Sequence, residues 1–375
     1  VCQVCGEEIE QDNICKLCDS FAELAYDLPR ARYIQENYTK PKEIKEAVKD
    51  WNSLLEAIGT KYTLLHDPPN VDSVYLINNV DFLGGKFKCN GFYFIAQNAP
   101  RLGEQIKTLE DIANESKGVK KWGVLRADVD DLGKVFKAGL GDEDRTISRL
   151  AMLSEMLGMF FNVQVEKIAR ESEFKDKIYV IYSGGDDLFV IGPWSLLPDF
   201  IMRLYQDFRK YTAETLTFSA AISIAPTKKF PVYHSAEQAK EDLELAKQDG
   251  KNKMTYFGIP VPWGKMNALK EIKDKIVFLL DENGPNLPRS LLQILSFGWI
   301  ETRRLKKGEV PMQRIWRFLY AMKKLKEKYK EYCADIDELE KAVIIDEQKI
   351  FRDYLEVPVR WAELLTRKEV RDERQ

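Results

Sequence analysis

The hydrophobic and polar positions of residues 118–262 follow two repeats, one typical of strands and one typical of helices. Apolar runs of strand length occur at 122–127, 177–182, 188–191, 216–224 and 255–258. Apolar residues at helical spacing lie between them, at 143–172, 195–211 and 235–248. The resulting order is strand, helix, strand, strand, helix, strand, helix, strand. Its first six elements match the ferredoxin-like split βαβ unit, so we predict an α+β centre.

Two regions with different patterns flank this centre. Residues 21–58 are polar with helical spacing, and strand-sized runs follow at 61–65, 73–78 and 91–97. Beyond Trp263 the spacing is helical to the end of the chain, with prolines between the helices. We therefore expect three domains, at 1–117, 118–262 and 263–375. In the last of them we predict that Trp299, Trp316 and Trp361 belong to the helical core.

Composition and charge exclude several classes of protein. The chain has 375 residues, 45% hydrophobic and 31% charged, with a formal net charge of −3, which is ordinary for a globular protein. No apolar run reaches the roughly 18 residues of a membrane helix, so we expect no membrane partner. Only two histidines occur, which disfavours histidine-rich metal sites. Since the chain opens on Val1 and carries no secretion signal, we interpret it as a cytoplasmic fragment of a longer protein.

Four cysteines near the start of the chain have the spacing of a zinc site. Cys2, Cys5, Cys15 and Cys18 form the pattern C-x2-C-x9-C-x2-C. Two such pairs suit the tetrahedral thiolate coordination of Zn²⁺. Disulfide bonds are the alternative, but a reducing cytosol opposes them. Four protein ligands leave the metal no open position. We therefore predict structural zinc and describe residues 1–117 as a zinc-binding linker domain with a β-rich second part.

Acidic residues follow two neighbouring strands of the predicted centre. Asp128 ends the first strand, and Gly184-Gly185 followed by Asp186-Asp187 joins the next two. A hairpin with two solvated acids is the simpler interpretation, because Gly-Asp turns are common. In a split βαβ sheet, however, the first strand lies beside this hairpin, so the three carboxylates should converge. Converging carboxylates repel one another, and a hard divalent cation such as Mg²⁺ or Mn²⁺ removes that cost.

Such a site suits nucleotidyl transfer. Metal ions held by Asp128, Asp186 and Asp187 can hold a phosphoryl group and activate a hydroxyl. Gly184 and Gly185 leave the backbone open to a nucleotide. Lysines at 247, 251 and 253 follow the third helix and could neutralise a triphosphate. For Lys253, a solvated lysine at a helix C-terminus is an equally good interpretation. We predict a palm-type nucleotidyltransferase domain at 118–262.

Three segments together resemble a known family. WGVLRADVDDLG at 122–133, ISRL at 147–150 and YSGGDDLF at 182–189 closely resemble the Csm-type large subunit of type III-A CRISPR effector complexes. AK at 246–247, followed by GKN at 250–252, is also similar to the GGDEF diguanylate cyclases, which share the palm. The resemblance covers essentially the whole chain: a zinc-bearing linker, a ferredoxin-like polymerase or cyclase palm, and a helical C-terminal domain. The family normally begins with an HD nuclease domain and a first palm, which implies truncation at the N-terminus.

The resemblance implies an activity and a set of site residues. The family makes 3′–5′ cyclic oligoadenylates from ATP, inside a complex of Csm-type subunits with a guide RNA and a target RNA. Asp186 and Asp187 would be catalytic, and Asp128 and the Val129 carbonyl would complete the metal site. Ser183 would lie near the adenine or ribose. The other implied nucleotide-binding residues are Gly184, Gly185, Lys247 and Lys251. Asp130 and Asp131 match acidic family positions but receive no metal. Because two ATP molecules sit between two palms in the family, we expect weak or no synthesis by the isolated fragment.

Two other functions stay open. A diguanylate cyclase would use GTP, but Asp187 stands where that family usually has Glu, and Leu188 where it has Phe. The zinc linker and helical C-terminal domain also have no place in it. A catalytically silent scaffold of a ribonucleoprotein is the second alternative. Mutually repelling acids at Asp128, Asp186 and Asp187 argue against it, because a silent site has no need to hold them.

Two smaller motifs complete the sequence. His66-Asp67 is an HD dipeptide, but HD nuclease sites need several histidines, so we interpret it as a loop pair. The cluster Arg303-Arg304-x-Lys306-Lys307 follows an apolar helix. It is either a solvated helix end, which the helix dipole favours, or a contact to RNA or a neighbouring subunit.

Overall fold

The computed structural model describes most of the chain. The described residues are 1–2, 4–9, 14–28, 30–41, 48–67, 73–77, 89–93, 99–103, 105–139, 141, 144–306, 308, 313–344 and 353–367. They divide into two compact units. One consists of Val1–Ile106 and Glu155–Gly185, and the other of Lys107–Ser154 and Asp186–Gln375. The domain boundaries after residues 117 and 262 stay predictions.

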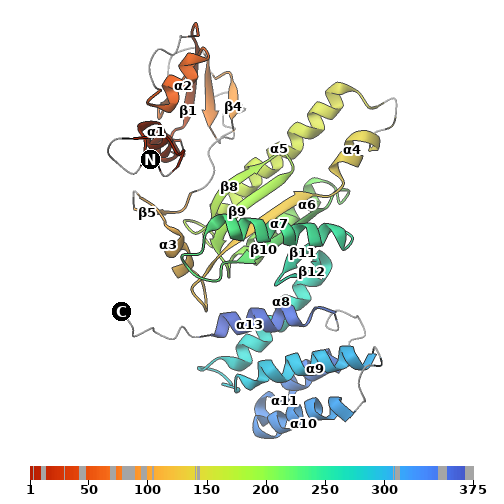
Figure 1. The fold of residues 1–375 in the computed structure, drawn as a ribbon. Coiled ribbons are helices and arrows are strands. Elements are labelled where there is room, and N and C mark those ends of the chain that lie inside the picture. The colour runs from red at the N-terminus through yellow and green to blue at the C-terminus, as the bar shows by residue number, and fades with distance from the viewer. Residues whose placement is uncertain are drawn as a thin grey trace. The chain divides into compact units, whose positions relative to one another are not determined.

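The first unit opens with a helix and a four-stranded sheet (Figure 1). Helix α1 (Lys16–Asp27) precedes the strands, and α2 (Trp51–Ala57) lies between β1 and β2 in the chain. The strands are β1 (Tyr33–Tyr38), β2 (Thr60–Leu65), β3 (Val74–Ile77) and β4 (Gly91–Tyr93), in the order β2-β1-β3-β4. β1 is antiparallel to β2 and β3, whereas β3 and β4 are parallel.

The sequence predicted three of these strands and missed one. The runs at 61–65, 73–78 and 91–97 are confirmed as β2, β3 and β4, although residues 78 and 94–97 lie outside the described part. The expectation of helix throughout 21–58 is wrong at β1. Its sequence YIQENY is polar, yet Tyr33 and Ile34 are buried on opposite faces by two separate apolar clusters. Pairing on both sides overrides the local pattern there.

The remaining elements of the first unit are short or come from the chain's centre. Strands β5 (Arg101–Leu102) and β6 (Gln105–Ile106) form an antiparallel pair. Residues 155–185 contribute most of helix α5 (Ile147–Ala169) and strand β8 (Tyr179–Gly184). The long helix and this strand were both predicted from the sequence.

A mixed sheet is the centre of the second unit. Its strands there are β7 (Trp122–Val129), β9 (Asp187–Pro193), β10 (Phe218–Ile224), β11 (Lys253–Tyr256) and β12 (Ile259–Pro262). They run in the order β12-β11-β10-β7-β9. β7 is antiparallel to both β9 and β10, as in a split βαβ unit, and only β10 and β11 among these are parallel. The α+β prediction is confirmed.

Helices bury this sheet. α6 (Leu197–Tyr211) and α7 (Val232–Gln248) both pack on β10, and Figure 1 shows α7 lying across one face of the sheet. β10 is buried along both faces because its residues are small or apolar. Trp122 and Trp194 are fully buried, and each indole N–H donates to a backbone carbonyl at 2.8 Å. Two short helices, α3 (Leu109–Asn114) and α4 (Leu132–Ala138), flank β7 in the chain.

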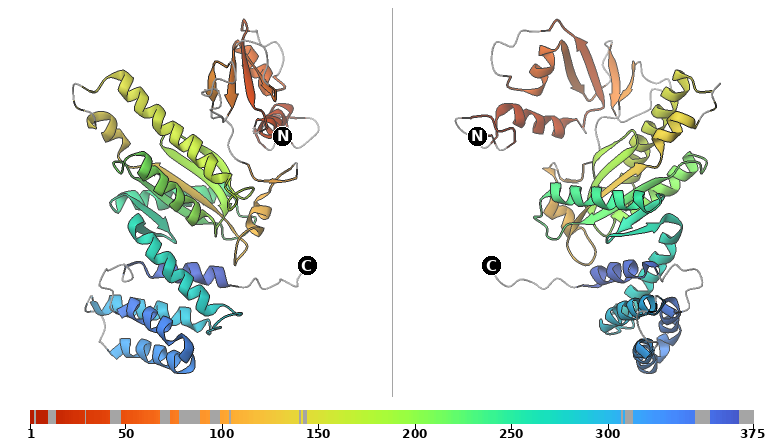
Figure 2. Two further views of the ribbon diagram at one scale, coloured as in Figure 1. Left: turned by 180° about the vertical axis from the view of Figure 1, so that it is seen from behind. Right: turned by 45° about the vertical axis from the view of Figure 1, so that its right-hand side comes forward.

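The rest of the second unit is helical, as the sequence predicted (Figure 2). The helices are α8 (Trp263–Leu280), α9 (Ser290–Lys306), α10 (Gln313–Lys328), α11 (Cys333–Ile344) and α13 (Glu356–Thr366), with a 3-10 turn at Lys330–Tyr332. One apolar cluster joins all of these helices, and it includes Leu279, Leu295, Phe318, Leu339 and Ala362. None of the described helices is long and apolar enough to cross a membrane.

The three tryptophans of this helical part differ in burial. Trp299 is 8% exposed and Trp361 is 1% exposed, which confirms their predicted core positions. The prediction is wrong for Trp316, which is 63% exposed on α10. Its neighbours Ile315 and Phe318 occupy the buried stripe of that helix instead. A tryptophan among leucines is therefore a poor indicator of burial when the helix has an apolar stripe without it.

Candidate active site and candidate zinc centre

Two predicted acids face each other across a strand pair in the second unit. Asp128 of β7 is directly opposite Asp187 of β9 in the antiparallel register. Residues in this relation project from the same face, with Cβ atoms about 4.5–5.5 Å apart. The ladder continues one residue further, because the Val129 N–H donates to the Asp186 carbonyl at 2.9 Å. The expected convergence is thus confirmed for Asp128 and Asp187.

Asp128 is half-buried and paired with a lysine. Lys247, in the last turn of α7, places its Nζ 2.7 Å from Asp128 Oδ1. Burial raises the pKa of Asp128, Lys247 opposes that rise, and the charges of Asp186 and Asp130 add to it. Lys247 therefore does not fully compensate the cost of the charged Asp128 carboxylate. A second cation near this carboxylate would stabilise it.

A second lysine lies on the same edge of the sheet. Lys251 follows α7 in a turn and places its Nζ 2.7 Å from Asp131 Oδ1. Lys134 reaches the same oxygen at 2.7 Å from the exposed side. These two lysines lower the pKa of Asp131, and Asp131 in turn raises the pKa of Lys251. Lys253 does not join this edge, since it turns back to Asp249 at the end of α7.

Asp130 points away from this edge, into the protein. It is 6% exposed, and its two oxygens accept hydrogen bonds from Ser219 Oγ, Thr217 Oγ1 and the Asn252 N–H at 2.7, 2.7 and 2.9 Å. Sequence reasoning gave none of these partners a role. The sequence signal that could have indicated the contact with Asn252 is the Gly250-Lys251-Asn252 turn, because such a turn needs a hydrogen-bond partner to hold it.

The carboxylates on this edge have the right chemistry for Mg²⁺ or Mn²⁺ but are not gathered into a ready-made site. Carboxylate and carbonyl oxygens are the donors these ions prefer, and Asp128, Asp186, Asp187 and the Val129 carbonyl supply them. Among the described residues, the one group of at least three metal-ligating side chains within 4.8 Å of one another is the cysteine cluster, not these acids. These oxygen donors fit Mg²⁺ or Mn²⁺. One of them, the Asp128 carboxylate, is already paired with Lys247.

The predicted residues at 183–185 belong to the first unit. Ser183 is 3% exposed, and its hydroxyl donates to the Phe161 carbonyl of α5 at 2.9 Å. Gly185 has a φ of +62°, which favours glycine, and a Cβ added there would meet nothing within 4 Å. The backbone at Gly185 is therefore open to an approaching molecule. A contact of Ser183 with adenine or ribose stays a prediction.

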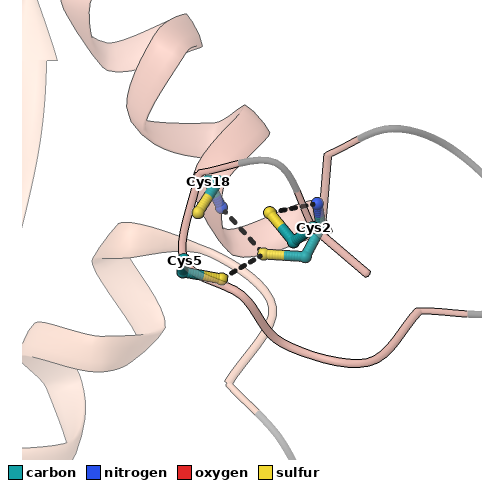
Figure 3. Close-up of side chains that lie close together, drawn as sticks. Cys2, Cys5 and Cys18 are labelled. Carbon is teal, nitrogen blue, oxygen red and sulfur yellow. Dashed lines mark hydrogen bonds between the residues drawn. The ribbon is translucent and has the colours of Figure 1, made fainter.

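The four cysteines come together in the first unit. Their sulfurs lie within 4.8 Å of one another, and Cys5 Sγ is 3.6 Å from Cys15 Sγ. Thiolates about 2.3 Å from a tetrahedral zinc are separated by roughly 3.8 Å, so this spacing fits Zn²⁺. Figure 3 shows the sulfurs of Cys2, Cys5 and Cys18 turned toward a common point. The structure describes all six cysteines as free thiols, so the disulfide alternative is not what it shows.

Local backbone geometry prepares this cluster for a metal. Cys15 is the N-cap of α1, and its sulfur accepts a hydrogen bond from the Cys18 N–H at 3.4 Å. Hydrogen bonds from the backbone N–H groups of Cys5 and Cys15 lower the pKa of Cys2 to about 6. A side-chain hydrogen bond with Cys15 raises the pKa of Cys18 to about 12, and desolvation and the charge of a Cys15 thiolate add to the rise. Zinc binding would replace these thiol protons, and the gathered sulfurs could hold the ion.

The two smaller motifs supply no residue to either candidate site. His66 and Asp67 are exposed directly after β2, which agrees with a loop pair, although the following prolines lie outside the described residues. At the end of α9, the Arg303 guanidinium lies over the Trp299 ring at 5.0 Å, and Arg304 is 3.6 Å from Glu301. Lys307 lies outside the described residues. Neither alternative for this basic cluster is decided by these contacts.

Comparison with known proteins defines the class first. Residues 121–255 match the family described as Cas10/Cmr2, second palm domain. These residues span β7 to β11 and so contain Asp128, Asp187, Lys247 and Lys251. The match therefore places a Cas10-type palm domain at residues 121–255.

Curated proteins named Cas10/Csm1 are similar to this chain. A Cas10/Csm1 protein of subtype III-A from Enterococcus italicus, named a CRISPR system single-strand-specific deoxyribonuclease, is 29% identical over 317 residues. One of the same name from Methanocaldococcus jannaschii is 35% identical over 178 residues. The alignments cover 77% and 41% of this chain, but 38% and 22% of the relatives. The chain is therefore similar to Cas10/Csm1 proteins of subtype III-A, and it spans less than half the length of these relatives.

Solved structures agree on the fold. A Csm1–Csm4 subcomplex of the type III-A interference complex has a TM-score of 0.65 at 20% identity, covering 93% of this chain and 49% of that one. The Csm1 structure from T. onnurineus has a TM-score of 0.66 at 19% identity, with coverages of 93% and 51%. A Csm1–Csm4 cassette in complex with cA4 scores 0.64 at 20% identity, with coverages of 93% and 48%. At these identities the likeness shows the fold.

Proposed function

We propose that this chain binds ATP with Mg²⁺ or Mn²⁺ at the edge of its palm, and that it takes part in joining ATP molecules into 3′–5′ cyclic oligoadenylates. One observation carries the proposal: Asp128 faces Asp187 across β7 and β9, with Lys247 bound to Asp128 and Lys251 on the same edge. Two acids and two lysines on one edge match the two needs of a metal–triphosphate complex, oxygen ligands for the cation and positive charge for the phosphates.

In the proposed site the acids would bind the cations and the lysines would bind the phosphates. When bound, the metal ions would polarise the α-phosphate and lower the pKa of a nucleotide 3′-hydroxyl. Asp128, Asp186 and Asp187 would hold the cations, and Gly185 would let the nucleotide approach the backbone. Lys247 and Lys251 would leave their carboxylate partners for phosphate oxygens as a triphosphate enters. In the proposed reaction the 3′-oxygen of one ATP bonds to the α-phosphorus of another, the hydroxyl proton is lost, and pyrophosphate leaves.

Solved relatives support the choice of nucleotide. Csm1–Csm4 cassettes of the same fold have been solved with one ATP, with the linear product pppApA and with the cyclic cA4. These ligands form a series from substrate to ring product in proteins of this fold. We carry that series over to this chain as a proposal, together with Csm-type subunits as partners and guide and target RNA through the assembled complex. The isolated chain is proposed to bind ATP and to synthesise little.

Binding of ATP and of GTP separates the proposed function from its two alternatives. Calorimetric titration of each nucleotide with Mn²⁺ into the chain should show ATP binding that requires the metal. The binding should be lost when Asp186 and Asp187 are both replaced by Asn. GTP preference would favour the diguanylate cyclase instead, and binding of neither nucleotide would favour the scaffold. Asp199→Asn is the matched control, because Asp199 is a half-buried acid paired with Lys270 in the same unit.

We also propose that Cys2, Cys5, Cys15 and Cys18 hold a structural zinc ion. Their sulfur spacing supports this role, and four thiolates would leave the metal no open position for catalysis. Zinc stoichiometry measured on the intact chain tests this proposal. About one zinc per chain is expected, and none after all four cysteines are replaced by serine.

A further inference from the structure

Asp130 lies between Asp128 and Asp131 in the sequence, but its side chain has different surroundings. Asp128 and Asp131 are both partly exposed and each is bound to a lysine. Asp130 is buried, and three neutral donors bind its two oxygens: the hydroxyls of Ser219 on β10 and of Thr217 just before it, and the Asn252 N–H. Its own N–H donates to the Thr217 carbonyl at 2.8 Å. Both of its oxygens are engaged inside the protein, so its position points to a role other than binding a metal ion.

The backbone group that Asp130 holds belongs to a strained turn. Gly250, Lys251 and Asn252 have φ angles of +99°, +63° and +53°. The left-handed region is unfavourable for a residue such as lysine, so neighbouring contacts must hold the turn in place. Asp130 Oδ2 accepts from the Asn252 N–H at 2.9 Å, which is a charge-assisted hydrogen bond.

Two aromatic residues hold the same turn from the other side. The Tyr205 hydroxyl donates to Asn252 Oδ1, and the backbone N–H of Trp263 donates to the Asn252 carbonyl at 3.5 Å. The Tyr205 and Trp263 rings stack at 4.3 Å with an interplanar angle of 13°. Asn252 is therefore fixed through its N–H, its side chain and its carbonyl, and only the first of these bonds comes from a charged group.

This turn sets the position of Lys251. The Lys251 N–H donates to the Ala246 carbonyl at 3.0 Å, which ties the turn to the end of α7. With its backbone fixed, the Lys251 side chain reaches Asp131 at 2.7 Å and lies in the field of Asp128. A lysine on a loose turn would spread its charge over many positions, which weakens its attraction for a phosphate.

We propose that Asp130 is a positioning residue for the nucleotide: its hydrogen bond to the Asn252 N–H fixes the 250–252 turn and so places Lys251 for the β- and γ-phosphates. This role rests on the proposed function, because it assigns a residue to the same nucleotide site. A buried acid that only supports the fold would affect every ligand alike. Asp130 instead acts on the phosphate end of the nucleotide through one lysine.

The test compares ATP with AMP in the 375-residue chain with Mn²⁺. Asp130→Asn should weaken ATP binding about tenfold, since a charge-assisted hydrogen bond is lost. AMP binding should change less than about twofold, because AMP lacks the phosphates that Lys251 would contact. Lys251→Met should give the same pattern. The double variant should be no weaker than Lys251→Met alone, because both changes remove one effect.

Two further variants keep the test decisive. Tyr205→Phe removes only the hydroxyl bond to Asn252 and keeps the ring, so it should weaken ATP by roughly two- to threefold even if Asp130→Asn folds poorly. Glu301→Gln is the matched control, because Glu301 is a buried acid, 4% exposed, on α9 of the same unit. It should leave both affinities unchanged.

The outcomes separate this role from the proposed function. ATP and AMP weakened equally by Asp130→Asn, or additive losses in the double variant, would make Asp130 a purely structural acid and overturn its positioning role. Unchanged ATP affinity in both Asp130→Asn and Tyr205→Phe would overturn it as well. If the unaltered chain and Glu301→Gln both bind no ATP, the proposed function itself has failed, and this role falls with it.

Discussion

The cysteine cluster and the carboxylate edge are two candidate metal sites with opposite degrees of preparation. The four sulfurs already lie within 4.8 Å of one another, and backbone N–H groups donate to Cys2 and Cys15. On the carboxylate edge, Asp128 and Asp187 share a register, but Asp128 is bound to Lys247 and Asp131 to two lysines. The cysteine cluster is already arranged for a single ion. On the carboxylate edge, lysines neutralise the acids as long as no ligand is bound.

This difference follows from what each site would do. A structural metal contributes to folding, so its ligands gain from being gathered by the fold itself. A site that must admit a metal–nucleotide complex cannot be filled in advance. Its lysines balance the acids in the empty state and become available for phosphates once cations take over the carboxylates. We therefore expect ligand loss to affect stability at the cysteine cluster and binding at the carboxylate edge.

The largest expected effect is the loss of zinc from the cysteine cluster. Replacing Cys5 by Ser removes one of four ligands, so zinc content should fall from about one ion per chain to near zero. The thermal transition of the first unit should be lowered or lost in calorimetry. Cys333→Ser is the control, because Cys333 is an exposed thiol far away in the sequence. Full zinc content in Cys5→Ser would contradict the assignment.

The second effect is loss of binding without loss of stability at Asp128. Asp128→Asn should weaken Mn²⁺-dependent ATP binding by about a hundredfold or more, because a charged metal ligand is removed. The raised pKa of Asp128 means that its charged form is less favourable in the folded chain than in the unfolded one. The metal-free melting temperature should therefore stay the same or rise. Asp199→Asn, with a lysine partner and similar exposure, should leave ATP affinity unchanged.

A pH titration sharpens the comparison further. Because burial raises the pKa of Asp128, this carboxyl takes up a proton at a higher pH than an ordinary aspartate near 3.9. Metal-dependent ATP binding should therefore weaken as the pH falls through that raised range. Over the same range the metal-free chain should gain stability, since its folded state binds the additional proton. Asp128→Asn should lose this gain in stability. A gain that persists in the variant would assign it to another group.

The smallest expected effect concerns Asp131, which pairs with Lys251 when no nucleotide is bound. Asp131→Asn removes the carboxylate that holds Lys251, so ATP affinity should rise by roughly two- to fivefold while stability changes by less than about 1 kcal/mol. Lys134→Ala removes the exposed partner of the same acid and should leave ATP affinity within about twofold. Weaker ATP binding in Asp131→Asn would show that Asp131 takes part in binding rather than competing for the lysine.

Much of the palm could be predicted because its pattern is strong. Strands such as 122–127 combine apolar runs with an acidic end, and both the strand and the β7–β9 pairing of Asp128 with Asp187 were confirmed. The four-cysteine spacing likewise predicted a group of sulfurs that the fold gathers. These features depend on local pattern and on one topological rule.

The rest depended on contacts between distant residues. β1 is polar in sequence and becomes a strand because β2 and β3 pair with both of its edges. Trp316 looks like a core residue, but the buried stripe of α10 passes through other residues. Asp130 received no metal in the sequence analysis, and only the fold brings Asn252 to it, 122 residues away.

Mn²⁺ binding followed by electron paramagnetic resonance tests the central claim most directly. Free Mn²⁺ gives a sharp six-line spectrum that broadens on binding. Because ATP itself binds Mn²⁺, the spectrum of the chain with Mn²⁺ and ATP is compared with that of Mn²⁺ and ATP alone. The account predicts tight Mn²⁺ binding that requires ATP in the unaltered chain and in Asp199→Asn, and its loss in Asp128→Asn and in Asp187→Asn. Equal Mn²⁺ and ATP binding in all four proteins would contradict the account, because the nucleotide would then lie away from the paired acids of β7 and β9.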